Sequence, residues 1–192
     1  MSNQLRARTN VARCRAVNAR MLGERFREVP MCECCGWQAL ASSDALTRGQ
    51  VLALISDIRP ARLAGDAARQ ADPACRIAAM LRPHTIVEEQ GLFAALAPDF
   101  PEQIALLEAE HRLIEAPLAE AVRAVGYGEL PADPAWPDRL TRALAVLREH
   151  IFKEQDGVFP AALATLRTAD WEAVDAARLA VAAVGGESAS AP

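Results

Sequence analysis

The chain has 192 residues, of which 52% are hydrophobic and only 5% aromatic. This length and apolar content suit one buried core and are small for two. Alanine, leucine, arginine and glutamate are plentiful, so the composition predicts an all-α fold rather than a sheet. No apolar run is long enough to cross a bilayer, and no apolar block of signal-peptide length stands near the N-terminus. We therefore expect a cytoplasmic protein with no membrane partner.

The net charge of −4 hides an asymmetry between the two parts of the chain. Residues 1–30 hold seven arginines and two glutamates, a net charge of +5, which leaves −9 for the remainder. This basic arm lacks interleaved aromatic residues and any fold signature of nucleic-acid binding, so we do not expect a nucleic-acid partner. We expect a poorly ordered extension, or a chain whose true first residue is Met31.

Capping residues, prolines and glycines divide the rest of the chain into helices. Asp72 followed by Pro73, for example, has the chemistry of a helix start. The expected helices cover residues 43–64, 72–96, 101–126 and 136–157, with a short fifth helix over residues 168–184. Four long helices with mostly short connections predict an antiparallel up-down four-helix bundle over residues 31–184. We expect residues 185–192 to be a disordered tail.

One segment of the sequence occurs twice in similar form. Residues 81–96, LRPHTIVEEQGLFAAL, and residues 147–163, LREHIFKEQDGVFPAAL, share the pattern His-x-x-x-Glu-x-x-Gly-x-Phe. Residues four apart lie on the same face of a helix, so His84 with Glu88 and His150 with Glu154 each form one patch. Imidazole and carboxylate are the usual ligands of iron, zinc or manganese, and bundle cores build two-metal sites from such pairs.

The histidine count supports this interpretation. The chain has three histidines, and the third, His111, lies on the helix between the two copies of the repeat. A lone histidine on a helix is typically solvated or hydrogen-bonded. Three histidines, two of them with a glutamate four residues on, predict a metal site instead.

The chain resembles the hemerythrin-like HHE domain over about residues 31–180. The resemblance rests on three segments in order: HTIVEEQGLF, then EH on the next helix, then LREHIFKEQDGVFPAAL. The Cys-rich segment MCECCGW at residues 31–37 is similar to the start of short bacterial members. The resemblance implies a non-haem di-iron site in a four-helix bundle. Its terminal ligands would be His84, His111 and His150, and its bridging carboxylates Glu88 and Glu154, for at most two iron ions. Family members bind O2 or NO, sense redox state or handle iron, and most are not conventional enzymes.

The chain departs from the family on the first helix, where the family has a histidine and this chain has TRGQVLALI. Either Arg48 takes the place opposite His111, or a small deletion before Val51 removed the ligand. Water or Gln50 could then complete a weaker site. Alternatively, the Arg48 cation could neutralise the two glutamates with no metal, because buried carboxylates are costly when unpaired. We expect the weakened metal site.

Other residues carry weaker signals. Cys32 and Cys35, with Cys34 between them, could form a redox pair or half of a metal site, but Cys14 and Cys75 stand at unrelated spacings. We therefore expect free, reduced thiols. Glu89 and Asp156 flank the proposed ligands and could support them or be solvated. The apolar residues of the repeat are expected in the core; they are Leu92, Phe93, Val158 and Phe159.

Three functional classes follow. The first is a protein whose iron binds O2 or NO, or reports redox or iron state. The second is a di-iron enzyme or an iron-handling or repair protein, acting in peroxide reduction, iron oxidation or iron-sulfur repair. The third is a metal-free interaction bundle. We favour the first class, and the sequence leaves the oligomeric state open.

Overall fold

The computed structural model describes residues 33–188, all of whose regular structure is helical. The elements are α2 (Glu33–Leu63), α3 (Ala67–Val87), the π-helix η1 (Glu88–Phe93), α4 (Ala94–Leu96), α5 (Pro101–Gly126), α6 (Trp136–Lys153), the π-helix η2 (Glu154–Val158), α7 (Phe159–Thr165) and α8 (Thr168–Ser188). Because α3, η1 and α4 follow one another without a break, as do α6, η2 and α7, the described residues form four long rods and one further helix. The expectations for the basic extension, Cys14 and Cys32 lie outside the described residues.

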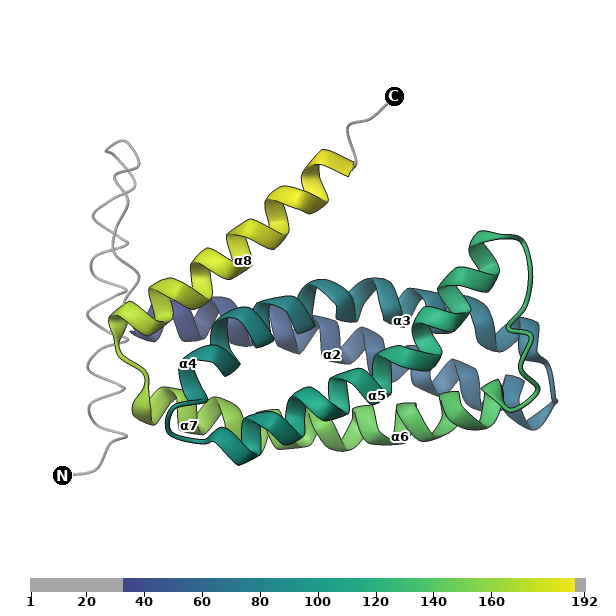
Figure 1. Cartoon of the computed structure of the whole chain (residues 1–192), viewed down its shortest axis with the longest axis horizontal. Coiled ribbons are helices and arrows are strands. Elements are labelled where there is room, and N and C mark those ends of the chain that lie inside the picture. Colours follow the sequence, from purple (N-terminus) through teal and green to yellow (C-terminus); the bar gives the residue numbers. More distant parts are fainter. Residues whose placement is uncertain (1–32, 189–192) are drawn as a thin grey trace.

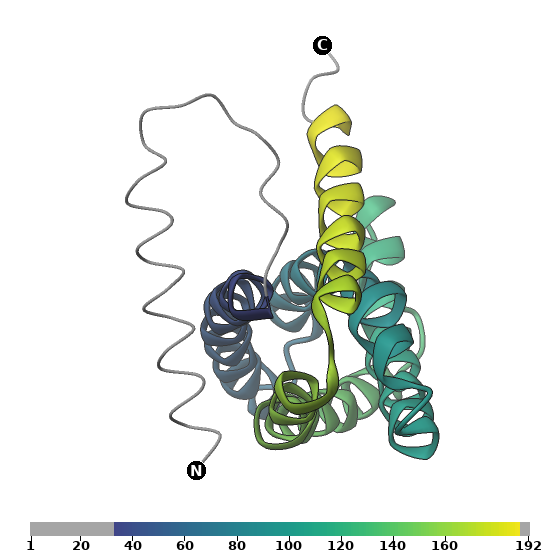
Figure 2. The ribbon, with the colours of Figure 1, turned by 90° about the vertical axis from the view of Figure 1, so that its left-hand side faces the viewer.

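The four rods form a closed antiparallel bundle, which confirms the expected fold (Figures 1 and 2). α2 packs against α3, α3 against α5, α5 against α6, and α6 against α2. Tight turns need glycine where φ is positive, as at Gly65 (φ 67°) between α2 and α3 and Gly128 (φ 72°) after α5. No helix among the described residues is long and apolar enough to cross a membrane.

Several helix boundaries differ from the expected ones. α3 begins at Ala67, where the Asp66 side chain accepts a hydrogen bond of 3.0 Å from the backbone N–H of Arg69. The expected start at Asp72 was therefore wrong, and Pro73 lies inside the helix. The earlier start buries residues of the first turns, a gain that offsets the backbone hydrogen bond that proline cannot make.

The other differences lengthen the helices. α2 begins at Glu33, ahead of the expected start at residue 43, and continues through Pro60. The fourth rod does not end near Gly157 but runs on through η2 and α7 to Thr165. α8 reaches Ser188, beyond the expected end at residue 184.

The core has two apolar layers with a polar layer between them. The first layer, at the end with the α2–α3 and α5–α6 loops, includes Leu81, Ile114, Leu147 and Trp136. The second layer, at the end with α4, α7 and α8, is built by Leu92, Phe93, Leu107, Val158, Phe159 and Trp171 among others. The predicted core positions of the repeat are confirmed, since all four are buried. Along each rod the repeat's polar residues fall between these layers.

Candidate metal centre

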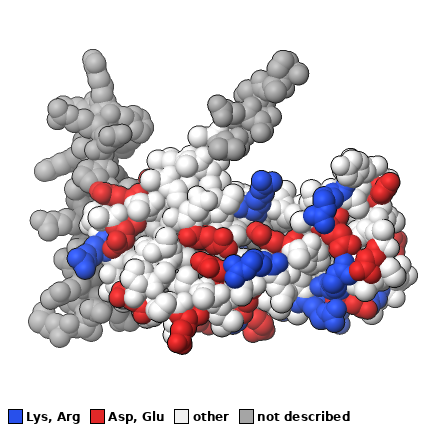
Figure 3. Space-filling model, in the orientation of Figure 1, with Lys and Arg blue, Asp and Glu red and all other residues white. Residues whose placement is uncertain are grey.

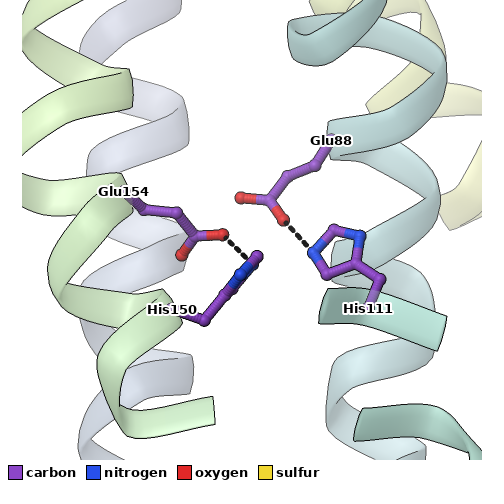
Figure 4. Close-up of side chains that lie close together, drawn as sticks. All are labelled: Glu88, His111, His150 and Glu154. Atoms are coloured by element: carbon purple, nitrogen blue, oxygen red, sulfur yellow. Dashed lines mark ion pairs between the residues drawn. The ribbon is translucent and has the colours of Figure 1, made fainter. Parts of the chain in front are cut away.

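Four polar side chains meet in the layer between the two apolar cores. Glu88 of η1, His111 of α5, His150 of α6 and Glu154 of η2 are 0%, 4%, 3% and 1% exposed. Each offers one ligand atom, and these four atoms lie within 4.8 Å of one another. Figure 4 shows the four side chains pointing toward one another from opposite sides of the bundle. A single ion could therefore contact side chains from three of the four rods.

The two buried histidines are held by carboxylates on their outer nitrogens. His111 Nδ1 lies 2.9 Å from Glu89 Oε1, and His150 Nδ1 lies 2.9 Å from Glu110 Oε2. A carboxylate can only accept, so each Nδ1 is the protonated nitrogen and donates. This leaves each Nε2 facing the cluster. Carboxylate support of the outer nitrogen is typical of metal-binding histidines, because it fixes the tautomer and the ring orientation.

The ring of His111 is fixed further by aromatic packing. Phe93 stacks on it with ring centroids 5.4 Å apart, and the His150 ring lies 4.6 Å away at a tilt of 57°. These contacts orient both imidazoles through apolar surface as well as through hydrogen bonds.

Close approach inside the cluster does not give aligned hydrogen bonds. His150 Nε2 lies 2.7 Å from Glu154 Oε1, and His111 Nε2 lies 3.5 Å from Glu88 Oε2. Yet His150 Nε2, Glu154 Oε1 and both carboxylate oxygens of Glu88 have no hydrogen-bond partner. Buried polar atoms left in this state cost free energy unless a cation or a water satisfies them.

Both copies of the repeat have the same local backbone, because each contains a π-helix. Glu88 is the first residue of η1 and Glu154 the first residue of η2, directly after an α-helix that carries the histidine four residues earlier. A π-turn inserts an extra residue into the helix, and such turns are frequent at functional sites. Sequence reasoning predicted continuous α-helix here and missed this widening.

Burial and mutual charge shift the pKa values of the cluster. Burial alone would lower the pKa of His150, but Glu154, Glu110 and Glu88 together raise it to about 9. The pKa of His111 is also raised, because Glu88 and Glu89 outweigh its burial.

The pKa values of the two buried glutamates shift in opposite directions. Burial would raise the pKa of Glu88, but the histidines around it lower it. Burial and the charge of Glu88 raise the pKa of Glu154 above its ordinary value. With no metal, the cluster therefore retains protons, and any bound cation must displace them.

His84 lies at the edge of this cluster. Its Nε2 is 3.3 Å from Glu88 Oε1, and its side chain is 17% exposed. The structure thus brings all five predicted ligands close together, four of them in one compact group and His84 beside Glu88.

Arg48 borders the same region from α2. A small cavity of about 20 Å³, room for a water-sized ligand, is lined by Arg48, His84, His111, His150 and Glu154 among others. Within the part of the chain that the structure describes, no ion pair joins Arg48 to Glu88 or Glu154. The arrangement does not favour a plug in which Arg48 neutralises the carboxylates.

Sequence reasoning missed two glutamates. Glu110 supports His150 across the α5–α6 interface, and its other oxygen pairs with Lys153. Glu115 lines the small cavity and follows His111 by four residues, which is the same His-x-x-x-Glu spacing as in the repeat. That spacing was the available signal for Glu115. Glu115 and Asp156 are both exposed.

The donor set fits a transition-metal ion. Two imidazole nitrogens and two carboxylates suit iron, manganese or zinc better than metals that prefer thiolates. The hydrogen-bonded outer nitrogens and the unsatisfied inward oxygens are the features expected of a preformed metal site.

The family assignment agrees with this geometry. The model of the hemerythrin HHE cation binding domain matches residues 49–162, more than half of the chain. The chain therefore belongs to the hemerythrin HHE cation-binding family. No curated protein and no solved structure matches it.

Proposed function

We propose that this protein is a non-haem iron protein whose metal centre is built from His84, Glu88, His111, His150 and Glu154. The observation that carries the proposal is the group of four buried ligand atoms within 4.8 Å, several of them without a hydrogen-bond partner. Burying two carboxylates in this way is costly unless a cation joins them. Membership of a cation-binding family supports the same conclusion.

We further propose that the two halves of the centre differ in affinity. The half with His111, His150 and Glu154 has two histidines supported by carboxylates. The half with His84 faces α2, which offers Arg48 rather than a histidine. Glu115 is exposed and lines the same cavity, and we infer that it complements His84. One ion should bind tightly, and a second should bind weakly at the His84 side.

The function that we favour is the binding of a small diatomic gas, O2 or NO, or the sensing of redox or iron state. Iron bound here would supply a redox-active centre with a coordination position that the chain leaves open. The cavity beside His84, of about 20 Å³, has room for a small ligand such as a water molecule or a diatomic gas. Its apolar walls include Val51, Leu81 and Ile114, which restrict the entry of larger polar molecules.

Metal analysis tests this proposal directly. Protein expressed in iron-replete medium and purified without added metal should contain iron, at up to two ions per chain. Oxidised protein should show the absorption bands of an oxo-bridged di-iron centre if both positions fill. A content below about 0.1 equivalent of any transition metal would contradict the proposal, because ligands already gathered in the fold should retain their ion. The metal-free bundle would then be the better description.

A further inference from the structure

The glycine of the repeated segment has a different environment in each copy. A Cβ atom added at Gly91 of η1 would lie 3.0 Å from Val174 Cα on α8, so α8 sits directly against this glycine. A Cβ atom added at Gly157 of η2 would meet nothing within 4 Å. The two halves of the bundle are therefore alike in sequence at this point, but only the first half is covered by a helix.

An apolar groove lies beside Gly157. It has a volume of about 480 Å³ and runs between the first turns of α5 and the η2–α7 segment. Phe100, Ile104, Leu107 and Ala161 contribute to its walls, and Gln103 and Lys153 are its polar residues. Leu106, also on its wall, is 55% exposed. We call this feature the α5–η2 groove; it occupies the place in the second half of the bundle that α8 fills in the first.

The exposed side of α8 is also apolar. Ala176, Leu179, Ala180 and Ala183 are all exposed and stand at the i, i+3, i+4, i+7 spacing of one helix face. Figures 1 and 2 show α8 leaving the bundle along this part of its length, and Figure 3 shows mostly uncharged surface where it departs. We call these four residues the α8 stripe.

The α8 stripe cannot enter the groove of its own chain. α8 is held on η1 by its opposite side, where Trp171 is fully buried and Val174 is 4% exposed. Leu179 is 54% exposed, so no part of the described chain covers the stripe. Within residues 33–188, each copy thus carries an apolar stripe and an apolar groove that no described residue covers.

We propose that the α8 stripe of one copy docks into the α5–η2 groove of a second copy of this chain. Three of the four stripe residues are alanine, which allows the close helix approach that Gly157 permits and that α8 already makes at Gly91. An amphipathic helix laid in an apolar groove is a common recognition mode. Two copies can exchange these contacts reciprocally, which closes a twofold dimer and leaves neither surface exposed.

The oligomeric state of the full-length protein tests the proposal. Size-exclusion chromatography with light scattering should give twice the chain mass of 20.6 kDa. Leu179→Glu on the stripe and Ala161→Glu in the groove should each give monomers, with at least about a tenfold loss of dimer affinity, because a charge would be buried in the contact. The matched control is Val122→Glu, an exposed apolar residue elsewhere on α5 (45% exposed), which should leave the dimer intact.

Mixing the variants makes the test specific. The Leu179→Glu chain keeps a good groove and the Ala161→Glu chain keeps a good stripe, so a mixture should recover one of the two contacts. Energy transfer between differently labelled chains should therefore appear in the mixture and be absent from either variant alone. Wild-type protein that is monomeric at all concentrations would overturn the proposal, as would a dimer that tolerates both substitutions. Circular dichroism of each variant identifies any loss of fold.

Discussion

Replacing Glu110 by glutamine removes the charge behind one proposed ligand without touching the ligand itself. Glu110 Oε2 lies 2.9 Å from His150 Nδ1, and the His150 ring is 3% exposed. Glutamine keeps an oxygen that can accept the Nδ1–H, but it no longer makes the imidazole more basic. Losses at such supporting positions are about 10- to 100-fold in metal affinity, which corresponds to about 1.4–2.7 kcal/mol.

Competition with a chromophoric chelator under anaerobic conditions, using ferrous iron, measures this affinity. Glu108→Gln is the matched control, since it removes the same charge from the same helix at a half-buried position that, within the described residues, forms no ion pair with His111 or His150. Lys153→Gln should have a smaller effect than Glu110→Gln, because Lys153 is 44% exposed and its ion pair with Glu110 is screened by water. If Glu110→Gln and Glu108→Gln bound iron equally well, with both proteins folded, His150 could not be a ligand oriented by Glu110.

Four further predictions concern metal, charge and packing. Chelation should lower the melting temperature, since a metal at a thousand times its dissociation constant adds about 4 kcal/mol, and His150→Ala should abolish this sensitivity in calorimetry. Arg48→His should tighten the second metal at least about tenfold in titrations, by adding a ligand of about 1.4 kcal/mol; unchanged affinity would mean that Arg48 does not face the site. In chelated protein, the pKa of His150 is raised from 6.5 to about 9, so its stabilising contribution of about 3 kcal/mol is complete below pH 6.5 and lost as the pH rises through 9. Thermal melts across this range would show a constant stability if the shift were absent. Gly91→Ala should destabilise the fold by about 1–3 kcal/mol in denaturant unfolding, whereas Gly157→Ala should not, because only Gly91 has backbone 3.0 Å from the new atom.

The fold and the principal polar cluster could be predicted because their signals are local. His84 and Glu88, and likewise His150 and Glu154, lie four residues apart, and helix geometry alone places each pair on one face. Burial of the apolar residues that follow each pair depends on the same periodicity.

The missed features depend on contacts between elements. Glu110 is the residue before His111 on α5, yet it supports His150 on α6, so nothing in the spacing along α5 reveals its partner. The start of α3 at Ala67, capped by Asp66 rather than Asp72, depended on the burial of early residues such as Gln70 and Ala71 in a helix that packs against α2. Asp66, which was not among the capping residues predicted from the sequence, has the same side-chain chemistry as Asp72, and tertiary packing decides between them.

Without a metal, the burial of two carboxylates in the cluster costs free energy, and this cost indicates that the site lacks a cation. Glu88 and Glu154 are buried together, and their pKa values shift in opposite directions: the surrounding histidines lower that of Glu88 against its burial, whereas burial and the charge of Glu88 raise that of Glu154. The lowered pKa of Glu88 keeps it charged, while the raised pKa of His150 provides a compensating proton. Arg48 lines the adjoining cavity but makes no ion pair with either carboxylate in the described part of the chain. Among the described residues, protons are thus the only counter-charges within this cluster, and a divalent cation at the same place would replace them with direct bonds to atoms that now have no hydrogen-bond partner.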